Sequence, residues 1–290
     1  MKRFKGCGTA LITPFDKEGN VDLVKYGELI DRQVENGVHF IVPLGTTGET
    51  PCLSDKEKLE IIQVAGKHCA GRPVLIGAGT NSTQGTIDNM KKMDCNYVDG
   101  FLIVTPYYNK PSQKGLYEHF KAVAASTKKS IVIYNVPGRT GVNITAETTL
   151  KLAEIPNIVA IKEASGNYGQ IAQIIKNAPE GFDVLSGNDD EVLSLMATGA
   201  AGVISVASNI APAMMVEMVE HLAAGRLDDA RKLHYRLMPL FKNCFIESNP
   251  IPAKAGMAYM GLIENIMRLP LTPATEQTYE IMKQTIDNLK

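Results

Sequence analysis

Eight short apolar segments, each followed by a stretch with helical periodicity, constrain the fold of this chain more than any other feature. The segments are Thr9–Phe15, Phe40–Gly45, Pro73–Gly79, Gly100–Pro106, Ile131–Pro137, Ile158–Ala164, Asp183–Asn188 and Gly202–Ser208. Their near-continuous apolar character is typical of parallel strands that are covered on both faces. Eight β-then-α units predict a (β/α)₈ TIM barrel, which typically needs about 250 residues. A doubly wound sheet is the alternative, because the number of strands does not prove that a sheet closes.

The intervening segments carry signals for the start of helices. Ser54-Asp55-Lys56-Glu57 has the pattern of a capping box, Thr145 precedes a periodic apolar segment, and Pro212 suits a first helical turn. Beyond the eighth unit the period stays helical, and one stripe carries Leu227, Ala230, Leu233, Leu237 and Leu240 or Phe241. We therefore expect a catalytic barrel over residues 1–225 and a C-terminal helical extension over residues 226–290.

Composition excludes several classes of function. The 290 residues include 30 Lys and Arg against 31 Asp and Glu, so no basic excess indicates binding to nucleic acid or an anionic membrane. No apolar run reaches the roughly 18 residues of a membrane span. The five cysteines form no C-x-x-C pair, and the segment Met1–Gly8 lacks an apolar signal core. These features predict reduced thiols in a cytoplasmic protein without a disulfide framework.

Lys162 is a charged residue inside the apolar segment Ile158–Ala164. Alternation along a strand predicts that Lys162 shares a face with Ile158 and Ala160. Desolvation favours the neutral form of a buried amine, and its lone pair can then attack a carbonyl carbon. We therefore interpret Lys162 as a Schiff-base nucleophile. The alternative is a lysine at the end of a strand that extends its ammonium to water.

Other polar residues follow the C-terminal ends of predicted strands, where TIM barrels place their chemistry. The segment Gly45-Thr46-Thr47-Gly48 could offer backbone N–H groups to a small anion. Arg139, after the fifth strand, could hold a substrate carboxylate with its guanidinium group. A surface ion pair is the alternative for this arginine.

Tyr134 lies near the end of the fifth strand and shares the parity of Val132, so it would point into the barrel, toward Lys162. A tyrosine relays protons only when its hydroxyl is hydrogen-bonded to another hydroxyl, which Thr46 and Tyr108 could supply. The alternative is a core aromatic whose hydroxyl is satisfied.

The residue pattern does not predict a metal site. No histidine follows a strand, and no H-E-x-x-H motif occurs. The acidic segment Asp189-Asp190-Glu191 could bind a hard cation. We instead expect Asp189 and its neighbours to cap and charge the next helix.

These motifs together resemble the dihydrodipicolinate synthase (4-hydroxy-tetrahydrodipicolinate synthase) family. The matching motifs are G-T-T-G-E at Gly45–Glu49, Y-Y-N at Tyr107–Asn109, Y-N-V-P-G-R-T-G at Tyr134–Gly141, I-K-E-A-S at Ile161–Ser165 and S-G-N-D at Ser186–Asp189. The wider superfamily of pyruvate-dependent class I aldolases includes N-acetylneuraminate lyase. In the lyases the position of Arg139 is typically not an arginine, so the resemblance favours the synthases.

The resemblance implies a Schiff-base-forming lyase of lysine and diaminopimelate biosynthesis. Lys162 would form an imine with pyruvate, without any other cofactor, and the enamine would attack L-aspartate-4-semialdehyde. By the same resemblance, Tyr134, Thr46 and Tyr108 would relay protons. The pyruvate site would consist of Thr46, Thr47, Gly187 and the carbonyl of Ile204, and Arg139 would bind the carboxylate of the semialdehyde.

The resemblance also implies a homo-oligomer, usually a tetramer built as a dimer of dimers, because Tyr108 would enter the site of a neighbouring subunit. Relatives inhibited by lysine usually carry histidine or similar groups after the G-T-T-G-E loop and a glutamate near Asn81. Asp55, Lys58 and Gly85 occupy those positions here. Lys58 would repel the ammonium of lysine, and Gly85 offers no carboxylate, so we expect weak or absent feedback inhibition.

Two alternative functions stay open at this level. The first is an aldolase for sialic acid or a 2-keto-3-deoxy sugar acid on the same barrel. The second is a non-catalytic barrel that binds or regulates a partner.

Overall fold

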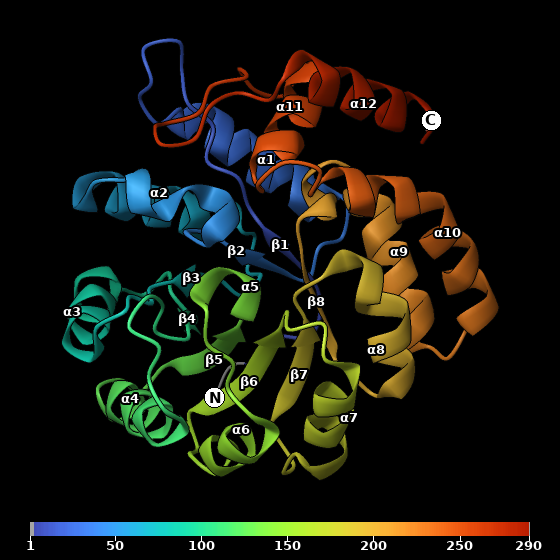
Figure 1. Cartoon of the computed structure of the whole chain (residues 1–290). Helices are drawn as coiled ribbons and strands as arrows, with labels where there is room; N and C mark the ends of the chain where they lie inside the picture. The colour runs from blue at the N-terminus through green and yellow to red at the C-terminus, as the bar shows by residue number, and fades with distance from the viewer. Residues whose placement is uncertain (1–2, 290) are drawn as a thin grey trace.

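The apolar segments form one parallel sheet in the computed structural model, which describes residues 3–289 (Figure 1). The strand order is β2-β1-β8-β7-β6-β5-β4-β3. A parallel bridge between Ile41 and Val74 joins the two end strands, so the sheet closes into a barrel. The doubly wound alternative is therefore wrong, and the predicted TIM barrel is confirmed. Met1 and Lys2, which open the N-terminal segment considered above, and Lys290 lie outside the described residues.

All eight strands overlap the predicted segments. They are β1 (Gly6–Ala10), β2 (Phe40–Val42), β3 (Leu75–Gly77), β4 (Gly100–Val104), β5 (Ser130–Asn135), β6 (Ile158–Glu163), β7 (Asp183–Ser186) and β8 (Gly202–Ser205). The prediction was wrong for most of Thr9–Phe15, because β1 begins earlier and ends at Ala10. Beyond Ala10 the chain leaves the sheet. The N–H of Ile12 donates to Oδ1 of Asn209 at 3.2 Å instead of to a neighbouring strand.

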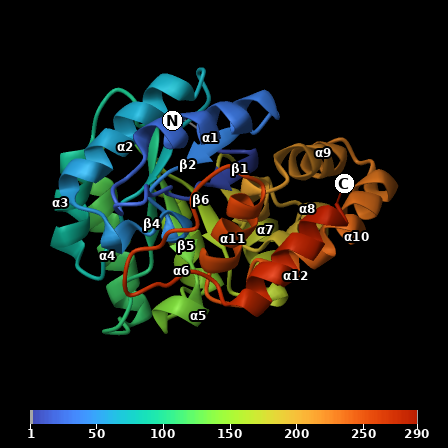
Figure 2. The same cartoon turned by 90° about the horizontal axis from the view of Figure 1, so that it is seen from above.

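Helices surround the barrel, as the views along two directions show (Figures 1 and 2). The outer layer contains α1 (Leu23–Glu35), α2 (Asp55–His68), α3 (Thr83–Met93), α4 (Gln113–Ala125), α6 (Ala146–Ala153), α7 (Tyr168–Asn177), α8 (Val192–Thr198) and α9 (Pro212–Ala223). The capping box before α2 is confirmed, because Ser54 and Glu57 each accept a hydrogen bond from the other's backbone N–H. Thr145 caps α6, and Pro212 is the first residue of α9.

Short turns follow several strands at the C-terminal end of the barrel. They are the helix α5 (Pro137–Thr140) and the 3₁₀ turns η1 (Thr46–Gly48), η2 (Thr50–Cys52), η3 (Asp189–Glu191) and η4 (Ala207–Asn209). Each turn places polar residues next to the end of a buried strand. The predicted concentration of polar groups at this end of the barrel therefore has a structural basis.

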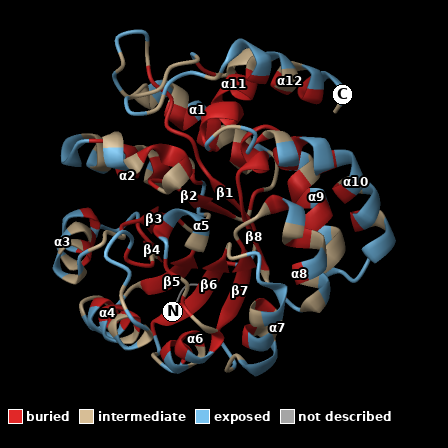
Figure 3. Ribbon diagram, viewed as in Figure 1, coloured by how far each residue is buried: buried red, intermediate tan, exposed pale blue. Residues whose placement is uncertain are grey.

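Two buried clusters, one inside the barrel and one between strands and helices, form the core (Figure 3). Val132, Tyr134 and Ala160 belong to the inner cluster. Ile158 belongs to the outer one, so the prediction that it shares a face with Lys162 was wrong. The pairing of β5 with β6 shifts register between Ile131 and Val132, and this irregularity turns Ile158 outward.

The C-terminal residues form three further helices, α10 (Leu227–Asn243), α11 (Ile251–Tyr259) and α12 (Glu276–Asp287). The predicted stripe on α10 buries Ala230, Leu237, Leu240 and Phe241, whereas Leu227 is 41% exposed. The apolar face of α10 packs against α9 of the barrel, and α11 packs against α12. No helix within residues 3–289 is long and apolar enough to cross a membrane.

Candidate active site

A cavity with a volume of about 570 Å³ opens at the C-terminal ends of the strands. Three of the predicted site residues line it, namely Thr46, Tyr134 and Arg139. They come from η1, β5 and α5, so segments far apart in the sequence meet around one space. A cavity of this size at this end of a barrel is where a small-molecule substrate is expected to bind.

Lys162 lies beside Tyr134 on the neighbouring strand, where the two residues are paired in register. The Nζ atom of Lys162 lies 4.2 Å from the centre of the Tyr134 ring. Only 6% of Lys162 and 8% of Tyr134 is exposed. A lysine at this depth does not extend to water, which excludes the alternative of a snorkelling strand-end residue.

Gly187 and Ile204 lie near this lysine. A Cβ atom on Gly187 would come within 3.1 Å of the Cε atom of Lys162 and 2.9 Å of the carbonyl oxygen of Glu163, so this position needs a glycine. Ile204 is buried in the same inner cluster as Tyr134. Neither residue lines the 570 Å³ cavity, and nor does Lys162, whereas Tyr134 contacts both the cavity and the amine.

The segment Gly45–Glu49 forms a tight turn at the cavity wall. The N–H of Gly48 donates to the carbonyl of Gly45 at 3.0 Å, and Glu49 has a left-handed backbone with a φ of 53°. Thr47 is 2% exposed, and its Oγ1 accepts a hydrogen bond from Nδ2 of Asn249 at 3.0 Å. N–H groups at the start of a helical turn have no acceptor within that turn, so those of Thr46 and Thr47 suit an anion.

Arg139 lies on α5 at the exposed side of the cavity. One guanidinium nitrogen, Nη2, donates to the carbonyl of Asn249 at 3.3 Å. No ion pair of Arg139 with a carboxylate occurs among residues 3–289, so its positive charge faces a cavity instead of a protein anion. This arrangement leaves the guanidinium available for a carboxylate ligand.

The structure does not bring Tyr108 to Tyr134 and Thr46. Tyr108 is 87% exposed, and its backbone is left-handed with a φ of 76°. A tyrosine with this φ is uncommon, because its Cβ atom crowds the backbone. The neighbouring Tyr107 lines the cavity of its own chain, whereas Tyr108 does not.

Asp189 does not cap the following helix, so that part of the prediction was wrong, whereas its neighbour Glu191 is the N-cap residue of α8. Its Oδ2 accepts hydrogen bonds from the N–H groups of Val206 at 3.0 Å and Ala207 at 2.9 Å, which fixes the chain after β8. Burial raises the pKa of Asp189, and its hydrogen bonds with Ser205, Ala207 and Val206 oppose this shift. Burial also raises the pKa of Glu191, whose Oε2 accepts from Asn188 at 3.0 Å.

Sequence reasoning missed Asn249 and Lys254, which reach the site from the C-terminal extension. Asn249 contacts both Thr47 and Arg139. Lys254 is fully buried and pairs with Glu49. The signal available in the sequence was a lysine within the apolar segment Ile251–Tyr259, the same kind of signal that singled out Lys162.

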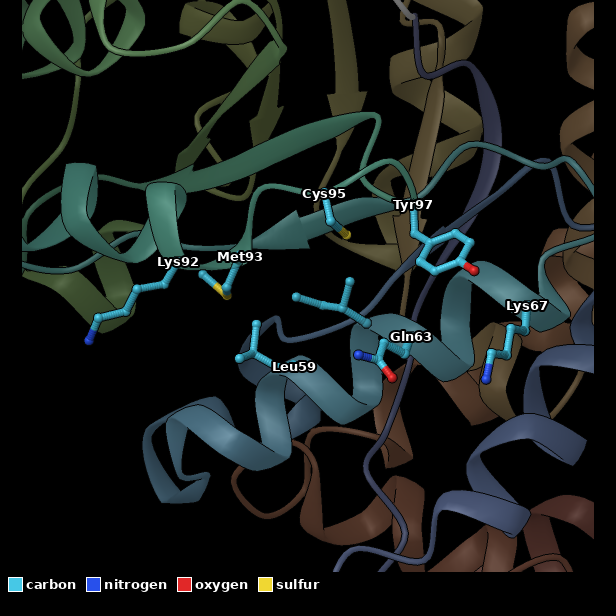
Figure 4. A pocket seen from close by; sticks show the side chains of 8 residues that line it. Leu59, Gln63, Lys67, Lys92, Met93, Cys95 and Tyr97 are labelled. Atoms are coloured by element: carbon cyan, nitrogen blue, oxygen red, sulfur yellow. The ribbon is translucent and has the colours of Figure 1, made fainter.

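A smaller pocket of about 340 Å³ lies outside the barrel, between α2 and the C-terminal end of α3 (Figure 4). Its lining residues are Leu59, Ile62, Gln63, Lys67, Lys92, Met93, Cys95 and Tyr97. None of them is a predicted site residue, so the larger cavity is the candidate active site. Within residues 3–289, no group of three or more His, Cys, Asp or Glu residues could hold a metal ion.

Known proteins similar to this chain belong to the family that its sequence motifs resemble. The sequence model of the Dihydrodipicolinate synthetase family matches residues 3–289. A 4-hydroxy-tetrahydrodipicolinate synthase of Parabacteroides distasonis is 47% identical over 287 residues, which are 98% of this chain and 97% of the relative.

Two solved structures have the same architecture. The dihydrodipicolinate synthase of Thermotoga maritima is 44% identical with a TM-score of 0.95, covering 99% of this chain and 98% of that one. The enzyme of Cyanidioschyzon merolae, solved with lysine bound, is 41% identical with a TM-score of 0.95, again over 99% and 98% of the two chains.

Proposed function

Because this chain belongs to the dihydrodipicolinate synthetase family, we infer that it condenses pyruvate with L-aspartate-4-semialdehyde as a Schiff-base-forming lyase. This reaction is a step of lysine and diaminopimelate biosynthesis. The observation that supports this chemistry at the level of the site is the buried amine of Lys162 beside Tyr134. A buried amine at the C-terminal end of a barrel strand is suited to attack a carbonyl.

We propose the following sequence of bonds. The neutral amine of Lys162 adds to the keto carbon of pyruvate and releases water, which gives an imine. Loss of a methyl proton from the protonated imine gives an enamine, whose carbon attacks the aldehyde of the second substrate. The amino group of that substrate then attacks the imine carbon and displaces Lys162, which closes the ring. The protonated imine acts as the electron sink, so no further cofactor is needed.

We propose roles for the remaining residues from their positions and from the family to which the chain belongs. The N–H groups of Thr46 and Thr47 would hold the pyruvate carboxylate, and Gly187 and the carbonyl of Ile204 would line the opposite side. The ring centre of Tyr134 lies 4.2 Å from the amine, and the hydroxyl of this residue would transfer protons with Thr46. Arg139 would bind the carboxylate of the semialdehyde at the open side of the cavity.

Product formation from pyruvate and L-aspartate-4-semialdehyde tests this function against a sugar-acid aldolase. We expect turnover of this pair and none of sialic acid or 2-keto-3-deoxy sugar acids. Turnover of a sugar acid instead would contradict the proposal. A protein that converts neither substrate and forms no adduct with pyruvate would be a binding protein. From the proposed pathway we also infer that the enzyme acts in the cytoplasm.

We propose that the active form is a homotetramer arranged as a dimer of dimers. Tyr108 supports this arrangement, because it is 87% exposed, has an unusual left-handed backbone and does not line the cavity of Tyr134 and Thr46 in its own chain. Tyr108 of one subunit would complete the site of its neighbour. Light scattering is expected to give the mass of four chains, and a fully active monomer would contradict this role of Tyr108.

We expect L-lysine at millimolar concentration to leave the activity nearly unchanged. Lys58 lines the same cavity, and its one ion pair among residues 3–289 is a 4.0 Å contact with Asp55. Its charge therefore faces an entering ammonium. The initial rate at increasing L-lysine measures this, and strong inhibition would contradict it. Lys58→His combined with Gly85→Glu is the matched variant, and it is expected to gain sensitivity to lysine.

A further inference from the structure

Lys254 and Glu49 form an ion pair in which neither side chain has exposed surface. The Nζ atom of Lys254 lies 2.7 Å from Oε1 of Glu49 and donates also to the carbonyl of Thr13 at 2.9 Å. The second carboxylate oxygen, Oε2, accepts from the N–H of Arg268 at 3.2 Å. Both oxygens of the carboxylate and two of the three ammonium protons are therefore satisfied.

Lys254 is not a second nucleophile. Its side chain has no exposed surface, and the ring of Phe15 covers its Nζ atom at 4.3 Å from the ring centre. A keto acid has no route to this amine. Stability alone is also a weak reason for the pair, because buried ion pairs are often no more stabilising than apolar side chains of the same volume.

The pair is attached to the turn that lines the active site. Glu49 is the last residue of the turn, and its N–H donates to the carbonyl of Thr46 at 3.2 Å. Thr13, which accepts from Lys254, donates through Oγ1 to the carbonyl of Gly48 at 2.7 Å. Lys254 thus holds the turn at two residues. It contacts Glu49 directly, and it contacts Gly48 through Thr13.

We propose that Lys254 and Glu49 are positioning residues, which hold the N–H groups of Thr46 and Thr47 in the geometry that receives the pyruvate carboxylate. The inference rests on the proposed function. It explains why a fully buried charge pair joins the helical extension to this turn. It also means that the extension supplies part of the active site, although Lys254 and Glu49 are 205 residues apart in the sequence.

The test compares Glu49→Gln, Lys254→Met and the double variant with the wild-type protein. Each single change leaves one buried charge without its partner, which lowers stability. The double change removes both charges, so an effect on pyruvate binding can be measured without the loss of stability caused by an unpaired charge. Asp183→Asn is the matched control, because Asp183 is a buried carboxylate paired with Arg3 at 2.6 Å, at the start of β7 and the opposite end of the barrel.

The main readout is the pyruvate concentration that half-saturates borohydride trapping, measured with the KM for each substrate, kcat and the Tm. In the double variant we expect this concentration and the KM for pyruvate to rise about tenfold, with the KM for the semialdehyde unchanged. Asp183→Asn is expected to lower the Tm and to leave the half-saturating pyruvate concentration and both KM values unchanged.

Two results would overturn the positioning role. One is a double variant that recovers the Tm and keeps the wild-type half-saturation. The other is an equal rise in Asp183→Asn, which would show a general effect of lost stability. Failure of the wild-type protein to trap pyruvate on Lys162 is a distinct result, and it would overturn the proposed function together with this inference.

Discussion

Lys162→Ala is expected to lower kcat by about 10⁴-fold or more, because the variant lacks the atom that forms the imine. Lys162 is 6% exposed and its Nζ atom lies against the ring of Tyr134, a position that Lys58 at the cavity wall does not share. Lys254, the other deeply buried lysine, is closed off by Phe15 and paired with Glu49. The measurement is the rate of product formation at saturating concentrations of both substrates.

Tyr134→Phe is the matched control for this variant. It keeps the ring that lies 4.2 Å from the Nζ atom of Lys162 and removes only the hydroxyl. We expect it to form the imine with pyruvate more slowly, and to lose turnover by roughly 10²-fold to 10⁴-fold, the usual range for a general acid or base. Substantial turnover in Lys162→Ala would mean that the amine is not the nucleophile.

Arg139→Ala is expected to keep the pyruvate adduct and to lose the second substrate. Hydrogen bonds to a charged group contribute about 1.5–3 kcal/mol, so kcat/KM for L-aspartate-4-semialdehyde should fall roughly 10²-fold. Trapping with pyruvate should stay near the wild-type level, because Arg139 lies at the exposed side of the cavity, away from the buried amine.

Arg139→Lys is the informative comparison. A lysine keeps the positive charge but has no planar pair of donors, so it should recover only part of the affinity for the semialdehyde. An unchanged condensation rate in Arg139→Ala would contradict the assigned role. Loss of the pyruvate adduct in the same variant would indicate that the arginine acts on the first substrate instead.

The fold was predictable because its signals are local. The capping box at Ser54–Glu57 follows from neighbouring residues and is confirmed, and each of the eight apolar segments overlaps a strand. The end of β1 was not predictable, since the N–H of Ile12 binds the side chain of Asn209, 197 residues away. The outward turn of Ile158 depends on the register with β5, which only the assembled sheet fixes.

The candidate site was predictable in part for the same reason. Strand parity and strand ends placed Lys162 beside Tyr134. The contacts of Asp189 with the chain after β8, and of Asn249 with Thr47, connect segments with no shared local pattern. The helix-capping prediction for Asp189 failed because a tertiary contact took its carboxylate, and local sequence carries no signal for such a contact.

The most direct test of the central claim is peptide mapping after borohydride reduction of the wild-type protein with pyruvate. We expect one stable adduct, on Lys162, in the peptide that contains Ile158–Glu163. An adduct on Lys254 or on any other side chain, or no adduct at all, would contradict it.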